Sequence, residues 1–233
     1  MSAFFVTGTD TDAGKTLVTS GLLALARRRG LTTLGLKPVA SGCEPTPEGL
    51  RNADALALQA QCHPTADYDT INPFAFVPAI APHLAARQAG MTLTLDDLVE
   101  RTRSLLERGR NLTLVESAGG WRVPLNESED LSALAIRLGL PVILVVGLRL
   151  GCISHARLTA EAIRADGLTL AGWAGSLVDP VFASDDALYR DNLATLEAKL
   201  PTPCLGIIPR LGTCEARTMA EYAADHLELP DGD

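Results

Sequence analysis

The nine residues GTDTDAGKT, at positions 8–16, constrain this chain more than any other stretch. They follow a short apolar run at residues 3–6 and precede a stretch with helical spacing at residues 17–29. The free amides and the dipole at the start of such a helix attract anions, Lys15 would reach the outer phosphates of a nucleotide, and the Thr16 hydroxyl would bind Mg²⁺. Five residues, rather than the usual four, separate Gly8 from Gly14. This order of strand, loop and helix predicts a phosphate-binding loop, and the alternative is a glycine turn that only caps the helix.

Apolar runs of strand length alternate with segments of helical spacing along most of the chain. This alternation predicts βαβ units and an α/β fold with a mostly parallel central sheet. Together with the phosphate-binding loop, it is typical of the P-loop NTPase fold. The runs are nearly continuous rather than alternating in polarity, so we expect helices on both faces of the sheet. The expected strands are residues 3–6, 33–36, 112–115, 142–146, 170–174 and 204–208, and the expected helices are residues 17–29, 95–107, 131–138, 155–165 and 186–200.

The chain is long enough for one substantial α/β domain, and no linker rich in Gly, Ser or Pro divides it, so we expect a single domain over residues 1–233. The proline-rich part, residues 38–82, is expected to fold over the sheet edge as a loop region with one short helix at residues 54–61. In open α/β sheets ligands bind beyond the carboxyl ends of the strands. The residues that follow each strand are therefore the candidates for a site.

The formal charge of -8, from 20 basic and 28 acidic residues, gives no electrostatic reason to expect nucleic acid or an anionic membrane as a partner. The sequence shows neither a signal peptide nor an apolar run of spanning length, which predicts a cytoplasmic protein. The five cysteines form no CxxC pair, and we expect them to be free thiols.

Lysine is rare here, because Lys15, Lys37 and Lys199 are the only lysines among the 20 basic residues. Lys15 and Lys37 therefore look specified for sites that a compact ammonium can enter and a planar guanidinium cannot. Lys37 follows the expected strand at residues 33–36, in the stretch LKPVASG. Taken alone, it could also be an ordinary surface lysine at a strand end.

Two acids are candidate Mg²⁺ ligands beside Thr16. Glu116 ends the apolar strand at residues 112–115, and Asp54 lies at the start of an amphipathic helix, where it could instead be only a helix cap. A second loop, RLGCISHA at residues 149–156, opens another helix with Ser154 as a candidate cap, and its amides could receive a substrate carboxylate. His83 and His155 lack metal-ligand spacing and are expected to be structural or to support other residues.

Taken together, the motifs resemble the dethiobiotin synthetases, a family of P-loop enzymes of biotin synthesis. The resemblance covers nearly the whole chain, and a first loop with five intervening residues is similar to the family's own variant. The matching stretches, in the family's order, are FFVTGTDTDAGKT, LKPVASG, TPEGLRNADALALQ, INPF, APH, VESAGGW, LPVILVVGLRLGCISHA, LAGW and LGIIP.

The resemblance implies that MgATP, carbon dioxide and 7,8-diaminononanoate give dethiobiotin, ADP and phosphate. One amine captures carbon dioxide as a carbamate, the γ-phosphoryl group is transferred to it, and the second amine displaces phosphate to close a cyclic urea. The family is homodimeric, and its substrate carboxylate is held at a helix start contributed by the neighbouring subunit.

Carried over to this sequence, the resemblance implies a catalytic group of Lys37, Lys15 and Thr11. Residues implied to bind the nucleotide are Asp12, Ala13, Gly14, Lys15, Thr16, Leu17, Asp54, Glu116, Ser176 and Pro209, with Ser176 standing where the family often has an adenine-reading Asn. Residues implied to bind the substrate are Ser41, Leu150, Gly151, Cys152 and Ser154, and those implied to hold Mg²⁺ are Thr16, Asp54 and Glu116.

Two other functions remain open at this stage. One is a nucleotide-driven switch of the partitioning ATPase type, although such switches usually carry a second lysine within the loop itself, where this chain has only Lys15. The other is a small-molecule kinase that leaves phosphate on its product.

Overall fold

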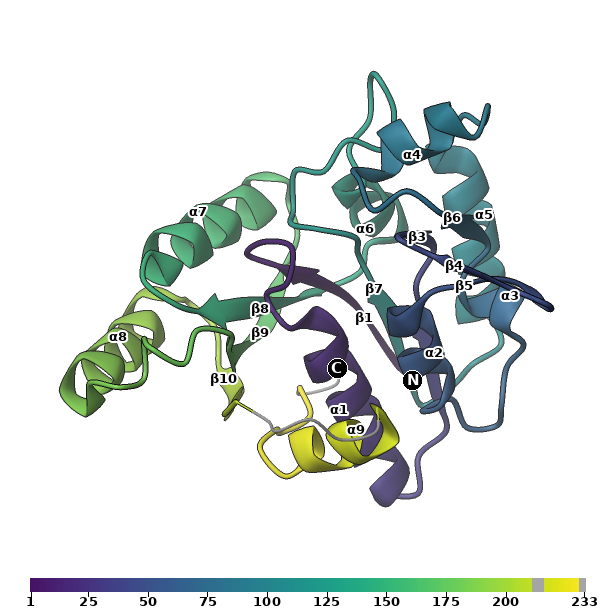
Figure 1. Ribbon diagram of the computed structural model, residues 1–233. Helices are drawn as coiled ribbons and strands as arrows, with labels where there is room; N and C mark the ends of the chain where they lie inside the picture. Colours follow the sequence, from purple (N-terminus) through teal and green to yellow (C-terminus); the bar gives the residue numbers. More distant parts are fainter. Residues whose placement is uncertain (211–215, 231–233) are drawn as a thin grey trace.

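The computed structural model describes residues 1–210 and 216–230. Its centre is a six-stranded sheet in the order β10-β9-β8-β1-β7-β2, in which every neighbouring pair is parallel (Figure 1). The strands are β1 (Ser2–Gly8), β2 (Thr33–Leu36), β7 (Leu112–Glu116), β8 (Val142–Leu148), β9 (Leu170–Leu177) and β10 (Cys204–Ile208).

Helices cover both faces of this sheet, as the continuous apolar runs predict. Alternate residues of β1 point to opposite faces, so Phe4 and Val6 enter one buried cluster and Phe5 enters the other. The first cluster includes side chains of α1 (Lys15–Arg28) and α9 (Ala216–Ala224). The second includes side chains of α5 (Leu95–Leu106), α6 (Ser132–Leu138), α7 (Cys152–Ala165) and α8 (Asp186–Lys199). The predicted fold class is confirmed.

The segment at residues 38–82 is more structured than the sequence predicts. Besides α2 (Ala53–Gln59), it holds α3 (Tyr68–Ile71) and two small sheets, one of β3 (Val39–Ser41) with β6 (Phe74–Phe76) and one of β4 (Glu44–Thr46) with β5 (Gly49–Arg51). The expectation of one helix in an otherwise irregular region is therefore wrong. Three-residue strands that pair with distant segments leave no local periodicity in the sequence.

The segment lies beside β2, the edge strand of the central sheet (Figure 1). It leads into α4 (Pro82–Gln88), a helix that the sequence analysis did not anticipate. The carboxyl end of β2 and this folded segment together form one side of the candidate site.

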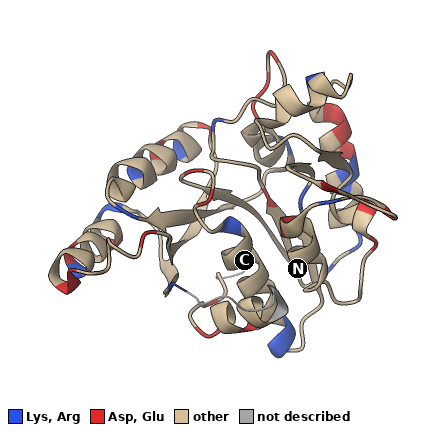
Figure 2. Ribbon diagram, viewed as in Figure 1, with Lys and Arg blue, Asp and Glu red and all other residues tan. Residues whose placement is uncertain are grey.

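Charged residues lie mainly on the helices and loops, while the ribbon of the central sheet is almost entirely uncharged in Figure 2. Basic and acidic residues are interspersed on the outer helices in that view. No helix among the described residues combines the length and apolar character that crossing a membrane requires.

Four cysteines lie in the described part of the chain, and all four are free thiols, as predicted. Cys43, Cys62 and Cys152 are buried, Cys204 is partly buried, and Cys214 lies outside the described residues.

Candidate active site

The loop between β1 and α1 has a backbone that few residue types tolerate. Gly14 is the N-cap of α1 at φ 90°, and Asp12 adopts φ 58°. Within the described residues, no side chain caps the start of α1, so its first amides remain available to an anion. A Cβ atom on Gly14 would collide with the Ser176 hydroxyl at the end of β9. The loop therefore needs glycine at this position both for its backbone angle and for its close packing.

Lys15 is buried at the start of α1, and its Nζ donates to the carbonyl oxygen of Asp10 at 2.9 Å. Burial, followed by repulsion from Lys37, lowers the pKa of Lys15 to about 8. The carboxylate of Asp10 in turn pairs with Arg149, which follows β8. This pair links the phosphate-binding loop to the segment that precedes α7.

Lys37 lies directly after β2, and its side chain is 6 % exposed. Its ammonium lies 2.7 Å from Oε1 of Glu116 and 3.0 Å from Oδ2 of Asp54. The hydroxyl of Thr16 donates to the same Glu116 oxygen at 2.8 Å. The residue after β2 thus meets one residue each from α2, β7 and α1 at the carboxyl edge of the sheet, where the topology predicts a site.

The electrostatic environment of this group favours the charged forms of Lys37 and Asp54. Burial by itself lowers the pKa of Lys37, but the Glu116 and Asp54 carboxylates raise it well above its ordinary value. Burial raises the pKa of Asp54, but Lys37 outweighs that effect and lowers it below the ordinary value. Asp54 does not cap α2, because Asn52 is the N-cap and its side chain accepts from the amide of Ala55.

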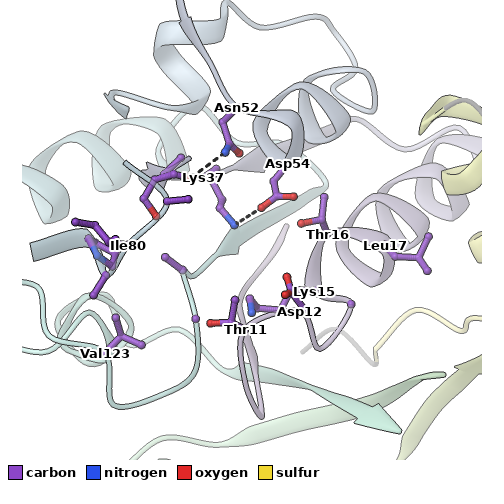
Figure 3. A pocket seen from close by; sticks show the side chains of 18 residues that line it. Thr11, Asp12, Lys15, Thr16, Leu17, Lys37, Asn52, Asp54, Ile80 and Val123 are labelled. Carbon is purple, nitrogen blue, oxygen red and sulfur yellow. Dashed lines mark hydrogen bonds and ion pairs between the residues drawn. The ribbon is translucent and has the colours of Figure 1, made fainter. Parts of the chain in front are cut away.

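A cavity of about 870 Å³ opens over this group (Figure 3). In the figure, the side chain of Lys37 points toward Asp54, and Thr16 lies close to Asp54, while Leu17 points away from them. Of the expected site residues, those that line the cavity are Thr11, Asp12, Gly14, Lys15, Thr16, Leu17, Lys37, Ser41 and Asp54.

Other expected site residues do not line this cavity. Glu116 is fully buried beneath Lys37, Ala13 is buried within the loop, and Ser176 lies against Gly14. The remaining residues that are absent from the cavity wall of this chain are Leu150, Gly151, Cys152, Ser154 and Pro209.

The expectation that Ser154 caps α7 is wrong. Gly151 is the N-cap of α7 at φ 94°, so Ser154 lies in the first turn, where it is exposed. Glycine tolerates the left-handed angle at this helix start, so α7 begins at Cys152, three residues before the expected helix at residues 155–165.

The segment after β7 lines the cavity through Ala118, Gly119 and Val123, which the sequence analysis did not assign to the site. The indole Nε1 of Trp121 donates to Asp166 at 2.8 Å, which anchors this segment to the end of α7. The Gly119–Gly120 pair, which begins three residues after the strand-end acid Glu116, was the available signal, because glycines near a strand end allow the backbone to approach a neighbouring loop closely. Ala79, Ile80, Ala81 and Pro82, before and at the start of α4, also line the cavity without having been assigned to it.

A parallel sheet, a glycine-rich loop between β1 and α1 and an acid at the end of β7 define a P-loop nucleotide-binding protein. The family model described as "AAA domain" matches residues 2–218. The chain is 68% identical, over 99% of both sequences, to the ATP-dependent dethiobiotin synthetase BioD of Chromohalobacter salexigens. It is 59% identical to that of Pseudomonas aeruginosa and 57% identical to that of Cellvibrio japonicus, and these matches cover 96–98% of each chain. The chain belongs to the ATP-dependent dethiobiotin synthetase family.

This membership makes the chain an ATP-dependent ligase of biotin biosynthesis that forms dethiobiotin, and the predicted function is confirmed. Among solved structures, the fold is similar to that of the MinC:MinD cell division complex of Aquifex aeolicus, with a TM-score of 0.59 at 13% identity over 96% of this chain and 86% of that one. The MinD protein of the same organism gives a TM-score of 0.57 at 12% identity, covering 97% and 86% of the two chains. At such low identity these likenesses show the fold alone, so they do not favour a nucleotide switch over the synthetase.

Proposed function

We propose that this chain forms dethiobiotin from 7,8-diaminononanoate, carbon dioxide and ATP through a phosphorylated carbamate. The observation that carries the proposal is the buried Lys37 ammonium, which lines the same cavity as the phosphate-binding loop and is held by Glu116 and Asp54 at 2.7 and 3.0 Å. A fixed positive charge between the γ-phosphate and a carbamate would stabilise the negative charge that shifts between them.

The proposed reaction has three steps. One amine of the substrate adds to carbon dioxide and loses a proton, which gives a carbamate. A carbamate oxygen takes the γ-phosphoryl group of ATP, and ADP leaves. The second amine attacks the carbonyl carbon, the bond to the phosphate oxygen breaks, and the nitrogen loses its proton as the cyclic urea closes. ATP therefore converts a poor leaving group, an oxide, into a good one, phosphate.

Residues of the loop and the cavity wall would position the reactants. Lys15 would leave the carbonyl of Asp10 and bridge the β- and γ-phosphates, while the amides at the start of α1 bind the phosphates. Thr11 and Ser41 line the cavity, and their hydroxyls would donate to the carbamate or bind the amine-bearing end of the substrate. Holding both reactants in one geometry supplies much of the rate enhancement that such a site can give. Ser176 and Pro209, at the ends of β9 and β10, would lie on the side of the base.

Thr16, Asp54 and Glu116 would hold Mg²⁺. Oε2 of Glu116 is buried and has no hydrogen-bond partner among the described residues, so this oxygen is free to bind a cation. Two carboxylates and a hydroxyl suit Mg²⁺, which takes its other ligands from phosphates and water. In residues 1–210 and 216–230 there is no group of three or more His, Cys, Asp or Glu side chains that could by itself hold a metal ion. The ion would neutralise phosphate charge and orient the γ-phosphoryl group.

We also propose a homodimer in which Leu150, Gly151, Cys152 and Ser154 of one chain bind the substrate carboxylate of the other. The start of α7 has no side-chain cap among the described residues, so its amides and dipole can receive an anion. Leu150, just before α7, is 80% exposed, and Leu158 on α7 is also exposed. A second copy of the chain would cover these apolar side chains.

The reaction is tested by incubating the purified protein with ATP, magnesium, bicarbonate and 7,8-diaminononanoate, followed by mass spectrometry of the product and an assay of phosphate. A cyclic urea formed with one phosphate per turnover supports the proposal. A phosphorylated diamine, or phosphate released equally fast without the diamine, would overturn it.

The shared site is tested by mixing two inactive variants. Lys37→Ala removes the reacting-site charge, and Ser154→Glu places a carboxylate where the substrate carboxylate would bind. If Lys37 and the Ser154 loop of one site belong to different chains, each heterodimer gains one intact site. Heterodimers make up half of the dimers after random exchange, so about a quarter of the wild-type activity returns. No recovery after subunit exchange would contradict the shared site.

A further inference from the structure

The backbone of Lys37 is held from outside the central sheet. The ladder between β2 and β7 ends at Leu36, opposite Val115, and Pro38 carries no N–H group. Both main-chain groups of Lys37 are instead bonded to two consecutive residues at the end of α3. Its N–H donates to the carbonyl of Ile71 at 2.9 Å, and its carbonyl accepts from Nδ2 of Asn72 at 2.7 Å. The position of the Lys37 ammonium therefore depends on the position of α3.

We call the two hydrogen bonds from Ile71 and Asn72 to the Lys37 backbone the clamp. The hydroxyl of Tyr68, at the start of α3, connects this clamp to a second segment, which begins at Asn52. It donates to Oδ1 of Asn72 at 3.0 Å and accepts from the backbone N–H of Asn52 at 2.7 Å. Arg51 lies over the Tyr68 ring, 4.2 Å from its centroid, and restricts the ring. One phenolic oxygen thus uses both its donor and its acceptor capacity to join two parts of the chain.

The side chain of Asn52 connects the Tyr68 hydroxyl to the positions of two residues of the site, Asp54 and Ser41. Its Oδ1 accepts from the amide of Ala55 and caps α2, whose first turn carries Asp54. Its Nδ2 donates to the carbonyl of Ser41 at 3.3 Å. The path from Tyr68 therefore reaches Lys37 through Asn72, and reaches Asp54 and Ser41 through Asn52.

Tyr68, Asn52 and Asn72 are all buried, at 7%, 7% and 3% exposure. Water is therefore poorly placed to replace any bond that is lost, and a buried network of this kind has one preferred geometry.

We propose that Tyr68 and Asn72 are positioning residues for the reaction, which set the Lys37 ammonium at its working distance from Asp54 and Ser41. This inference rests on the proposed role of Lys37 at the reacting group. The Tyr68 hydroxyl does not line the cavity, so its effect passes through the backbone rather than through a contact with substrate. Displacing a catalytic group by about 1 Å can cost up to a hundredfold in rate.

The test is Tyr68→Phe, which removes one oxygen and keeps the ring. The matched control is Tyr189→Phe on α8, whose ring packs against Phe182 away from this network. For Tyr68→Phe we expect kcat, expressed per ATP-binding site, to fall by about tenfold, while KM for ATP stays within about twofold of the wild-type value. Tyr189→Phe should leave both constants unchanged. Counting ATP-binding sites distinguishes a lower kcat of the folded enzyme from a smaller fraction of folded enzyme in the sample.

A second variant tests the same path at its other end. Asn72→Asp keeps an acceptor for the Tyr68 hydroxyl but cannot donate to the Lys37 carbonyl, so it should lower kcat in the same way. The double variant should be no slower than the slower single variant, because both changes release the same clamp. If kcat per site is unchanged in Tyr68→Phe, or the two effects multiply, the inference is wrong.

Different turnover results would contradict the proposed role of Lys37 and the positioning role of Tyr68 and Asn72. Turnover retained in Lys37→Ala would overturn the role of Lys37 and the positioning path with it. Turnover lost in Lys37→Ala but unchanged in Tyr68→Phe and Asn72→Asp would overturn only the positioning path.

Discussion

Oε1 of Glu116 accepts from both the Lys37 ammonium, at 2.7 Å, and the Thr16 hydroxyl, at 2.8 Å. Lys37 and Glu116 thus form a buried ion pair that joins the end of β2 to the end of β7. The same carboxylate leaves Oε2 without a partner among the described residues. One acid therefore holds the proposed reacting-site lysine, and its second oxygen would bind the proposed magnesium ion.

Glu116→Gln should raise the magnesium concentration needed for half-maximal turnover by about tenfold or more, because an amide is a weaker ligand and carries no charge. A magnesium titration of product formation measures this directly. Glu107→Gln, at the exposed end of α5, is the matched control and should leave the titration unchanged. An unaltered titration in Glu116→Gln would remove this residue from the metal site.

Lys37→Ala should lower turnover by about a hundredfold or more while ATP still binds, because the proposed charge acts only at the reacting group. Lys37→Arg should not restore the rate, since a planar guanidinium does not fit the space of the compact ammonium between Asp54 and Glu116. Steady-state kinetics and calorimetric ATP binding separate the two effects. Lys199→Ala, on the exposed end of α8, should behave as wild type. Near-normal turnover of Lys37→Ala would contradict its assignment.

The parts of the fold that local patterns specify were predictable. Six apolar runs predicted the six strands of the central sheet, because strands buried on both faces are continuously apolar. The loop at Gly8–Thr16 and the acid at the end of β7 were predictable for a related reason, since strand ends of a parallel sheet meet at one edge. The sequence also indicated Lys37, through the scarcity of lysine rather than through any motif.

What depends on contacts between distant segments was not predictable. β3 pairs with β6 across more than thirty residues, and the clamp of Ile71 and Asn72 on Lys37 spans a similar separation. No periodicity encodes such contacts. The roles of the individual site residues, the magnesium ion, the dimer and the extent of the domain stay predictions.

The affinity for ATP should fall as pH rises above about 8, since the pKa of Lys15 is lowered to about 8 by burial and by Lys37. Below that pH Lys15 is charged and attracts the phosphates, and above it the free protein must take up a proton on binding. The Kd should therefore rise by up to about tenfold per pH unit between pH 8 and the ordinary pKa of lysine. Lys37 stays charged over this range, because its pKa is raised.

Calorimetric titration of the nucleotide at a series of pH values measures this dependence. Lys199→Ala should keep it and Lys15→Met should abolish it, together with much of the affinity. A Kd that is independent of pH up to about 10 would show that Lys15 does not bind the phosphates as an ammonium.

Gly14→Ala should disable the phosphate-binding loop for two separable reasons. Gly14 adopts φ 90°, which is strained for alanine, and the new Cβ would collide with the Ser176 hydroxyl. Gly90 is the matched control, because it adopts φ 70° and a Cβ there would meet no atom of the described residues within 4 Å. Gly90→Ala should lower the free energy of unfolding by about 1 kcal/mol and leave ATP binding unchanged. Gly14→Ala should lower the free energy of unfolding further and weaken ATP binding at least about tenfold, measured by thermal unfolding and calorimetry.

The double variant Gly14→Ala with Ser176→Gly separates the collision from the backbone strain. Removing the Ser176 side chain relieves the collision alone, so ATP affinity should return in part and the cost of the positive φ should remain. If Gly14→Ala binds ATP as tightly as Gly90→Ala does, the loop tolerates a side chain at its tightest point, and the close packing of β9 against it does not shape the nucleotide site.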